Sequence, residues 1–421
     1  MRDVELYQAV LGIQSPWRVS KVGLALEEGR VDVWVEHGRG ERFACPECSE
    51  SCAVYDHMPE RTWRHLDTCQ YVTQLHAAPP RIRCETHGIK QVRLAWAEPK
   101  SRFTLLFERF AIDVLLATDI AHAAKILRVS WDEAFAIKER AVKRGQARRE
   151  AEPAEPTRVG VDEKSPGKQK AFFTIVSDLD TKTVRWIGDG LKGATLDAYW
   201  AERTPEELGA IECIAMDMGQ AYFGSALRNV PDASQKVVCD RCHVMQHATK
   251  AVDQVRRNEN ASLLRQGQSS PLAKTRHMWL YSQENLPARF VDRFADLKAM
   301  ELKTGEAWAM KELLRTLWRF DSKSAAGRFL SKLVRSLQDT KMRPLQRLAA
   351  TLEHHRKNIL TYIDHRVTSA ACEGLNAAIQ AIKCGARGFR NRENFKNAIY
   401  FKLGGLQLYP ELPPQAPAPT P

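Results

Sequence analysis

The sequence lacks the apolar segments that membrane insertion or secretion requires. No apolar run approaches the roughly 18 residues that a membrane span needs. The first residues, MRDVELYQAVLG, include acidic side chains and lack the apolar core of a secretion signal. We therefore expect a cytoplasmic protein without a membrane partner. In a reducing compartment, the ten cysteines favour metal binding over a disulfide framework.

Acidic residues are also in short supply. The chain has 51 Asp and Glu against 63 Lys and Arg, a net charge of +12. Such a surplus favours a polyanionic partner, above all nucleic acid, and the alternative is an ordinary basic enzyme. At 421 residues the chain is long enough for more than one hydrophobic core, so we expect several domains.

The N-terminal part has the pattern of a small β-rich unit. KVGLALEEG and RVDVWVEHG alternate apolar and polar residues on either side of Gly29, which predicts two strands joined by a turn. Two short pairs of metal-ligand residues follow, Cys45-x-x-Cys48 and Cys84-x-x-His87. Because Zn²⁺ takes four tetrahedral N/S ligands, often from two tight turns, these four residues predict one structural Zn²⁺.

Three other interpretations of these cysteines stay open. The residues could be buried free thiols, or the Cys-x-x-Cys pair could carry redox chemistry. Alternatively, Cys52 or Cys69 could replace one of the four ligands.

From about residue 103 to 149 the pattern becomes helical. Two helices lie around a turn at Val129–Ser130, with Ser130 as N-cap and Glu133 at the capping-box position. This arrangement predicts a helix-turn-helix whose second helix enters a major groove, and the alternative is any surface helical hairpin. The predicted DNA-contacting residues of the second helix are Lys138, Arg140, Lys143 and Arg144.

Residues 158–245 return to an α/β pattern after the linker AEPAEP. RVGVDEKS, KAFFTIVSDL, KTVRWIGDG, AIECIAMDM and QKVVCDRCHV predict five strands, with helices around the fourth. Three strands in succession, followed by helix, strand, helix and strand, is the order of an RNase H-like domain. Residues from about 246 to 350 are predicted to be helical, with Trp279, Trp308 and Trp318 in the core.

Three acids have the pattern of residues presented at the edge of packed elements. Asp162 follows the apolar run RVGV, and Asp217 ends AIECIAM. In an RNase H-like sheet the first and fourth strands are neighbours, so these two acids can converge. Glu373 lies on a predicted helix whose apolar stripe is Leu375, Ile379 and Ile382. Two Mg²⁺ or Mn²⁺ ions about 3.5–4 Å apart, held by such carboxylates, carry out phosphodiester chemistry.

Other residues near the acids are weaker candidates. Asp240 and His243 are predicted at the edge of the site, although for His243 a purely structural role is the favoured interpretation. Basic residues after Glu373 would contact DNA phosphates, and the alternative is a solvated basic face. They are Lys383, Arg387, Arg390, Arg392 and Lys396.

Over nearly all of residues 40–405 the chain resembles the ISL3 family of bacterial insertion-sequence transposases. The segments that carry the resemblance are CPEC…RTWRHLD…RIRCETHG, GVDEKS, AMDMGQAY, VVCDRCHVMQHATKAVDQVRR and ACEGLNAAIQAIKCGARGFRNRENFKNAIYFK. The resemblance implies a zinc-binding domain, a helix-turn-helix and a DDE catalytic domain whose acids are Asp162, Asp217 and Glu373. It also implies a helical insertion between Asp217 and Glu373.

The expected fold is therefore multidomain: an N-terminal β-rich zinc-binding unit, a helical helix-turn-helix, and an α/β RNase H-like catalytic domain with an all-α insertion. The expected boundaries are 1–100 for the zinc domain, 101–150 for the helix-turn-helix, 151–157 for the linker, 158–245 with 360–405 for the catalytic domain, 246–359 for the insertion, and 406–421 for a disordered Pro-rich tail.

The leading functional hypothesis is a DNA transposase. It would bind the terminal inverted repeats of an insertion sequence as double-stranded DNA, and cut and join DNA with two divalent ions. We expect a homodimer or higher oligomer on DNA, associated with the bacterial nucleoid. The alternatives are a non-catalytic DNA-binding regulator derived from a transposase, and an RNase H-like nuclease without a joining step.

Overall fold

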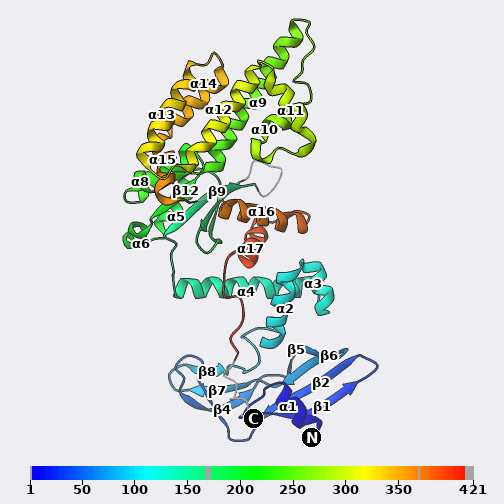
Figure 1. Cartoon of the computed structure of the whole chain (residues 1–421). Coiled ribbons are helices and arrows are strands. Elements are labelled where there is room, and N and C mark those ends of the chain that lie inside the picture. The colour runs from blue at the N-terminus through cyan, green and yellow to red at the C-terminus, as the bar shows by residue number, and fades with distance from the viewer. Residues whose placement is uncertain (1, 166–171, 368–369, 413–421) are drawn as a thin grey trace, which may run out of the picture. The chain divides into compact units, whose positions relative to one another are not determined.

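The computed structural model describes residues 2–165, 172–367 and 370–412, and the chain forms two compact units. Unit 1 contains residues 1–153 together with 406–421, and unit 2 contains residues 154–405. In Figure 1, the strands of unit 1 are blue and its long helices cyan, whereas unit 2 runs from green to red. The chain therefore leaves unit 1 once and returns to it at the C-terminal end.

Unit 1 begins with helix α1 (Asp3–Val10) and two four-stranded sheets, of order β1-β2-β6-β5 and β3-β4-β7-β8. The predicted hairpin is confirmed, because β1 and β2 pair antiparallel around Gly29, which has a φ of +62°. Side chains of both sheets, among them Val33 and Ile82, pack with Trp63 in one core. The strands are β1 (Trp17–Ala25), β2 (Arg30–His37), β3 (Arg42–Ala44), β4 (Ser51–His57), β5 (Arg61–Thr68), β6 (Tyr71–Ala77), β7 (Pro80–Cys84) and β8 (Gly88–Gln91).

Three helices follow the sheets: α2 (Leu105–Ala117), α3 (Ile120–Leu127) and α4 (Trp131–Ala151). The predicted capping box at the start of α4 is confirmed. Ser130 Oγ accepts the Glu133 amide at 3.2 Å, and Glu133 Oε2 accepts the Ser130 amide at 2.8 Å. These bonds satisfy amide groups that would otherwise lack partners at the helix start, so the turn between α3 and α4 is fixed locally.

Residues 406–412 are not the disordered tail that the proline content suggested. They run along unit 1, where the side chain of Leu408 is buried and Tyr409 donates a hydrogen bond to Asp113 at 2.6 Å. Arg148 donates to the backbone oxygens of Gln407 and Tyr409 at 2.9 and 2.7 Å. Proline does not prevent this, because the partners are carbonyl oxygens, which proline retains. Residues 413–421 lie outside the described residues.

Unit 2 is built on a five-stranded sheet of order β11-β10-β9-β12-β13. All five predicted strands are confirmed. β10 pairs antiparallel with β9 and β11, whereas β12 pairs parallel with β9 and β13. The strands are β9 (Arg158–Lys164), β10 (Phe173–Asp178), β11 (Thr183–Asp189), β12 (Cys213–Met216) and β13 (Val237–Cys239). The helices between them are α5 (Gly193–Ala201), α6 (Pro205–Ala210), α7 (Gln220–Asn229) and α8 (Ala233–Lys236).

A helical array follows β13. Its core contains Trp279, Trp308 and Trp318, which confirms the prediction that these tryptophans are buried. The helices are α9 (Arg241–Arg265), α10 (Arg276–Leu280), α11 (Val291–Ala299), α12 (Lys303–Thr316), α13 (Lys323–Asp339), α14 (Arg343–His354) and α15 (Arg356–His365). Short 3₁₀ turns lie at Gln283–Asn285, Ala288–Phe290 and Leu317–Arg319.

The last two helices, α16 (Ala370–Gly385) and α17 (Arg392–Leu403), return to the sheet. The predicted apolar stripe of α16 is confirmed. Leu375 and Ile379 pack with Phe173 and Ile175 of β10, and Ile382 is partly buried against the same cluster. The opposite, polar stripe of α16 is therefore fixed in direction by this packing.

Candidate active site and metal centre

Three aspartates lie in one row at the carboxyl ends of adjacent parallel strands. Val161 of β9 pairs with Met216 of β12, and Met216 pairs with Cys239 of β13. The residue after each of these is an aspartate, namely Asp162, Asp217 and Asp240. Because parallel strands in register carry equivalent residues at one level, the sheet gathers the three carboxyl groups along one edge.

Asp162 is held by two hydrogen bonds. Its Oδ1 accepts the backbone amide of Glu163 at 2.7 Å, and its Oδ2 accepts the side-chain amide of Asn376 on α16. Burial raises the pKa of Asp162 above the ordinary value, and the negative charge of Asp240 adds to this effect. The site therefore favours a positive charge close to Asp162.

His243, in the first turn of α9, connects the other two aspartates. Its Nδ1 lies 3.1 Å from Oδ2 of Asp240, and its Nε2 lies 4.0 Å from Oδ2 of Asp217. The hydrogen bond to Asp240 raises the pKa of His243 to about 9, and the charges of Asp217 and Asp162 act in the same direction. Asp240 also caps α9, because its Oδ1 accepts the Cys242 amide at 2.8 Å.

Glu373 is exposed in the first turn of α16, one turn before Asn376. Residues three apart on a helix share a face, so Glu373 lies on the side of α16 that bonds to Asp162 through Asn376. Among the described residues, the groups of potential ligands whose atoms all lie within 4.8 Å of one another do not include Asp162, Asp217 and Glu373 together. The row of aspartates and the helix of Glu373 are thus joined by Asn376, without mutual contact of all three acids.

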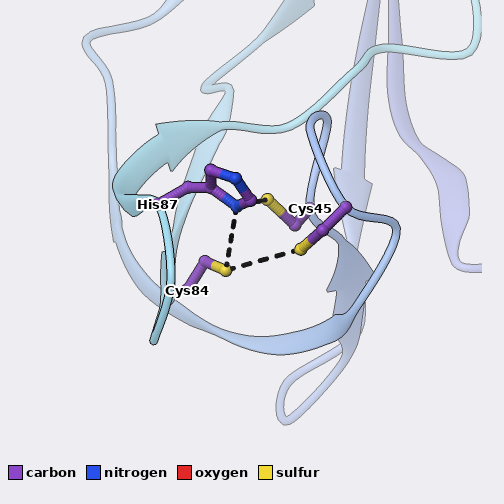
Figure 2. Close-up of side chains that lie close together, drawn as sticks. Cys45, Cys84 and His87 are labelled. Carbon is purple, nitrogen blue, oxygen red and sulfur yellow. Dashed lines mark hydrogen bonds between the residues drawn. The ribbon is translucent and has the colours of Figure 1, made fainter.

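A second cluster in unit 1 contains the four predicted zinc ligands. The ligand atoms of Cys45, Cys48, Cys84 and His87 all lie within 4.8 Å of one another. Figure 2 shows Cys45, Cys84 and His87 close together. His87 Nδ1 lies 3.8 Å from Cys45 Sγ and 3.7 Å from Cys84 Sγ, and the Sγ atoms of Cys48 and Cys84 are 3.7 Å apart. Backbone amides of residues 47 and 48 lower the pKa of the Cys45 thiol to about 7, which favours the thiolate that binds metal.

The two alternative cysteines differ in position. Cys52 lies with Glu50 and Cys84 in a second group, and its thiol donates to the Glu50 carbonyl at 3.4 Å. Cys69 lies in the turn between β5 and β6 and belongs to neither group.

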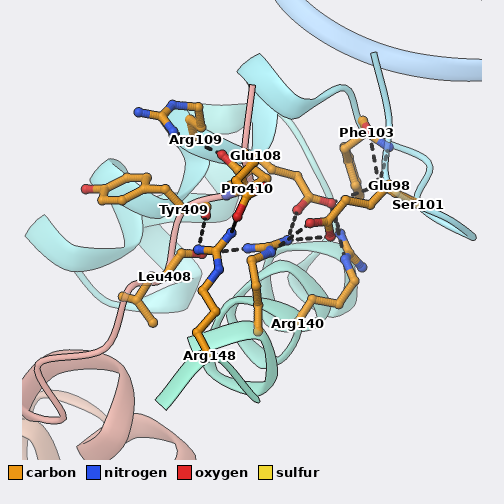
Figure 3. A network of polar contacts seen from close by, with 12 residues as sticks. Glu98, Ser101, Phe103, Glu108, Arg109, Arg140, Arg148, Leu408, Tyr409 and Pro410 are labelled. Carbon is orange, nitrogen blue, oxygen red and sulfur yellow. Dashed lines mark hydrogen bonds and ion pairs between the residues drawn. The ribbon is translucent and has the colours of Figure 1, made fainter. Parts of the chain in front are cut away.

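The predicted base-reading residues of α4 mostly turn inward. The buried Glu108 accepts hydrogen bonds from Arg140 at 2.6 Å and from Arg144 at 3.0 Å, and Arg144 also pairs with Glu98 at 2.5 Å. Figure 3 shows this network together with residues 408–410. Lys138 is buried as well, whereas Lys143 is exposed. Lys138, Arg140 and Arg144 were predicted to contact DNA bases, but the structure turns them inward. For Arg140 and Arg144 the reason is Glu108, because a buried carboxylate without a charged partner would be unfavourable.

The basic residues after Glu373 fall into two groups. Lys383 donates to the backbone oxygen of Ser165 at 3.2 Å, and Arg392 and Lys396 pair with Asp189 at 2.5 and 2.7 Å. Arg387 and Arg390 are exposed, and neither forms an ion pair with any residue that the structure describes. These two guanidinium groups are the ones available to an external anion.

Comparison with known families identifies the family of the chain. The DDE model of the ISL3 family, described as "Transposase", matches residues 159–399, which is more than half of the chain. The chain belongs to the ISL3 family of transposases. A model described as the zinc-finger of transposase IS204/IS1001/IS1096/IS1165 matches residues 41–87, and one described as the helix-turn-helix domain of transposase family ISL3 matches residues 92–137.

Curated relatives match this ISL3 transposase over nearly its whole length. The transposase for insertion sequence element IS1557 of Mycobacterium tuberculosis is 25% identical over 98% of both chains. The transposase for insertion sequence element IS1001 of Bordetella parapertussis is 24% identical over 94% of this chain and 97% of its own. The protein is accordingly a DNA transposase with a zinc ribbon and a helix-turn-helix, and the regulator and nuclease alternatives are not favoured.

Sequence reasoning did not identify every residue that shapes the site. Asn376 was not singled out from the sequence, and its bond to Asp162 spans 214 positions. The signal that could have revealed it is its spacing, one turn after Glu373 on the same face.

Among the described helices, none combines the length and apolarity needed to cross a membrane.

Proposed function

We propose that this ISL3 transposase cuts and joins DNA with Asp162, Asp217 and Glu373 as ligands of two divalent ions, Mg²⁺ or Mn²⁺. The proposal rests on the way strands β9 and β12 and helix α16 bring these acids towards one edge of the sheet. Two of the acids follow paired residues of adjacent parallel strands, and the helix of the third is hydrogen-bonded to the first acid. Carboxylate oxygens are the ligands that Mg²⁺ prefers.

The donor set fits a divalent ion. Each oxygen of Asp162 accepts one hydrogen bond and keeps a second acceptor position. The side chain of Asp217 is 46% exposed, so it is accessible to both an ion and a DNA phosphate. We propose that Glu373 completes the ligand set when DNA and the ions are bound.

Two such ions would lower the pKa of the attacking water or 3′-hydroxyl and stabilise the leaving oxygen. The chain's own residues supply orientation. The backbone amide of Met218 donates to Oδ1 of Asp217 at 2.6 Å, and His243, held by Asp240, lies 4.0 Å from its Oδ2. The bonds to Glu163 and Asn376 restrict the carboxylate of Asp162. Arg387 and Arg390 would hold the DNA backbone through its phosphates without reading sequence.

We propose that the catalytic domain is RNase H-like and comprises residues 158–245 and 360–405, with 246–359 as an all-α insertion. The support is the sheet order β11-β10-β9-β12-β13, in which antiparallel strands precede parallel ones. The helical array follows the strand that ends before Asp240 and precedes the helix of Glu373. The insertion would thus separate Asp217 from Glu373 in sequence while leaving the sheet intact.

For unit 1 we propose a division into a zinc domain, residues 1–100, and a helix-turn-helix, residues 101–150, which together recognise terminal inverted repeats. The support for a structural Zn²⁺ is the closed set of four N/S ligands. Lys143 is the exposed basic residue of α4 among those predicted to read bases. A homodimer or higher oligomer on DNA, at the nucleoid of the bacterial cytoplasm, would bring two ends together.

The proposal is tested with the full chain, a target duplex, and a transposon end in both uncut and pre-cut form. Wild-type protein is expected to join the end to the target in Mg²⁺. Asp217→Asn should bind the end normally and neither cleave nor join, because one metal ligand is weakened. Cleavage without joining by the wild type would indicate a nuclease, and full activity of Asp217→Asn would contradict the assignment of the acids.

A further inference from the structure

Helix α16 is anchored to strand β9 by a small set of polar bonds around Asn376. The side-chain amide of Asn376 donates to Oδ2 of Asp162, and the backbone oxygen of Asn376 accepts from Lys164 Nζ at 3.2 Å. Two turns later, Lys383 Nζ donates to the backbone oxygen of Ser165 at 3.2 Å. Asn376 is the member of this set that touches one of the proposed catalytic acids directly.

The close approach of the helix depends on a glycine in β9. A Cβ atom on Gly160 would lie 2.7 Å from Cys372 Sγ and equally close to side-chain atoms of Leu179 and Ser177. Real Cβ atoms do not approach other atoms so closely, so only glycine lets the first turn of α16 lie against the strand. Cys372 immediately precedes Glu373, and this packing therefore sets the distance between the strand and the turn that carries Glu373.

Hydrogen bonding to Asp162 decides which way its carboxylate faces. The backbone amide of Glu163 binds Oδ1, and the amide of Asn376 is the side-chain donor to Oδ2. Without Asn376, the half-buried carboxylate loses the donor that opposes rotation about its last side-chain bond. Groups that orient metal ligands in this way typically change metal affinity or activity by about 10- to 100-fold when removed.

We infer that Asn376 is a positioning residue for catalysis: it fixes the carboxylate of Asp162 and, through one turn of α16, the place of Glu373 relative to it. The inference rests on the proposed function, because it concerns how the same acids hold divalent ions. The contacts that the structure gives Asn376 are with Asp162 and Lys164, so it is assigned a positioning role. Its effect is transmitted through the orientation of the two acids.

The test uses full-length protein on a pre-cut transposon end. Mn²⁺ affinity is measured by electron paramagnetic resonance in Ca²⁺-free buffer, and joining rates are measured across a Mg²⁺ titration. Asn376→Ala is expected to weaken Mn²⁺ binding and raise the Mg²⁺ requirement by about 10- to 100-fold, with unchanged end binding. Gln380→Ala is the matched control, since Gln380 lies on the same helix and its side-chain amide bonds to Cys384 instead of to one of the acids.

Asn376→Gln keeps the amide donor and should restore part of the Mn²⁺ affinity. Wild-type Mn²⁺ affinity and Mg²⁺ requirement in Asn376→Ala would overturn the inference, whatever happens to the maximal rate. If Asn376→Ala does not fold, the same measurement on Asn376→Leu decides, because leucine has a similar size and no amide donor, and a wild-type Mn²⁺ affinity in Asn376→Leu overturns the inference. Asp217→Asn separates the two levels: if it binds Mn²⁺ and joins DNA normally, the proposed function itself fails.

Discussion

The guanidinium group of Arg144 donates a hydrogen bond of 2.5 Å to the backbone oxygen of Leu408, although the two residues are 264 positions apart. The same side chain pairs with Glu98 and with the buried Glu108. Helix α4 is thus held both by the N-terminal part of unit 1 and by the C-terminal segment that returns to the same unit. Unit 1 is complete only when residues 406–412 are present.

Leu408→Ala should therefore destabilise unit 1. The side chain is 4% exposed, and Leu→Ala changes at buried positions typically lower the free energy of unfolding by about 2–5 kcal/mol. Gln407→Ala is the matched control, because the exposed Gln407 contributes its backbone oxygen, which the substitution keeps. Urea unfolding, monitored by hydrogen exchange in α4, measures the stability of both variants. Equal exchange in the two variants would show that the C-terminal segment does not stabilise α4.

Arg144→Ala and Lys143→Ala should act on different properties. Removing Arg144 takes one of two arginine partners from the buried Glu108, which keeps Arg140, so unit 1 should lose about 1–3 kcal/mol of stability. Removing the exposed Lys143 should leave stability within about 0.5 kcal/mol and weaken DNA binding. Fluorescence anisotropy with cognate and scrambled ends gives the binding part. A folded Arg144→Ala protein with relaxed base preference would contradict the structural role assigned to Arg144.

Local sequence patterns predicted some features of unit 1 and of the site but not the direction of Arg144. Local signals predicted the capping box of Ser130 and Glu133, because its partners are three residues apart. Apolar runs bounded by turns likewise predicted strands β9 to β13. The inward direction of Arg144 depends on Glu108 and Leu408, which approach it only in the folded chain. The bond between Asn376 and Asp162 is another long-range contact: helix spacing places Asn376 on the face of Glu373, but it does not identify Asp162 as the partner.

The zinc cluster makes a prediction about ligand identity. Wild-type protein should carry one Zn²⁺ per chain, and His87→Ala should lose it to a chelator and unfold the zinc domain, because structural zinc contributes folding free energy. Cys69→Ala and Cys52→Ala should retain the metal. Elemental analysis after chelator treatment provides the measurement. Loss of zinc from Cys52→Ala together with retention in His87→Ala would reassign the fourth ligand to Cys52.

His65 should make unit 1 sensitive to acid. Burial, with a smaller contribution from the charge of Arg64, lowers the pKa of His65 to about 4, and its Nδ1 lies 2.8 Å from the Thr104 hydroxyl. The unfolded chain binds a proton near pH 6.5, so stability is full above that pH and is lost as pH falls towards 4.

The expected loss from His65 at pH 5 is about 2 kcal/mol relative to pH 7. His65→Asn removes the titrating group, so the difference between variant and wild type isolates this effect from acid release of zinc. The urea midpoints of both proteins at pH 7 and pH 5 give the comparison, measured by hydrogen exchange in peptides that cover β5. An identical fall in both proteins would exclude His65 as the source.

The central claim is that Asp162, Asp217 and Glu373 act together on divalent ions. The most direct measurement is a structure of the full chain on transposon-end DNA with Mn²⁺. We expect two ions about 3.5–4 Å apart, with Asp162, Asp217 and Glu373 as protein ligands. A DNA-bound state in which any two of these carboxylates lie more than roughly 10 Å apart would contradict shared two-ion chemistry.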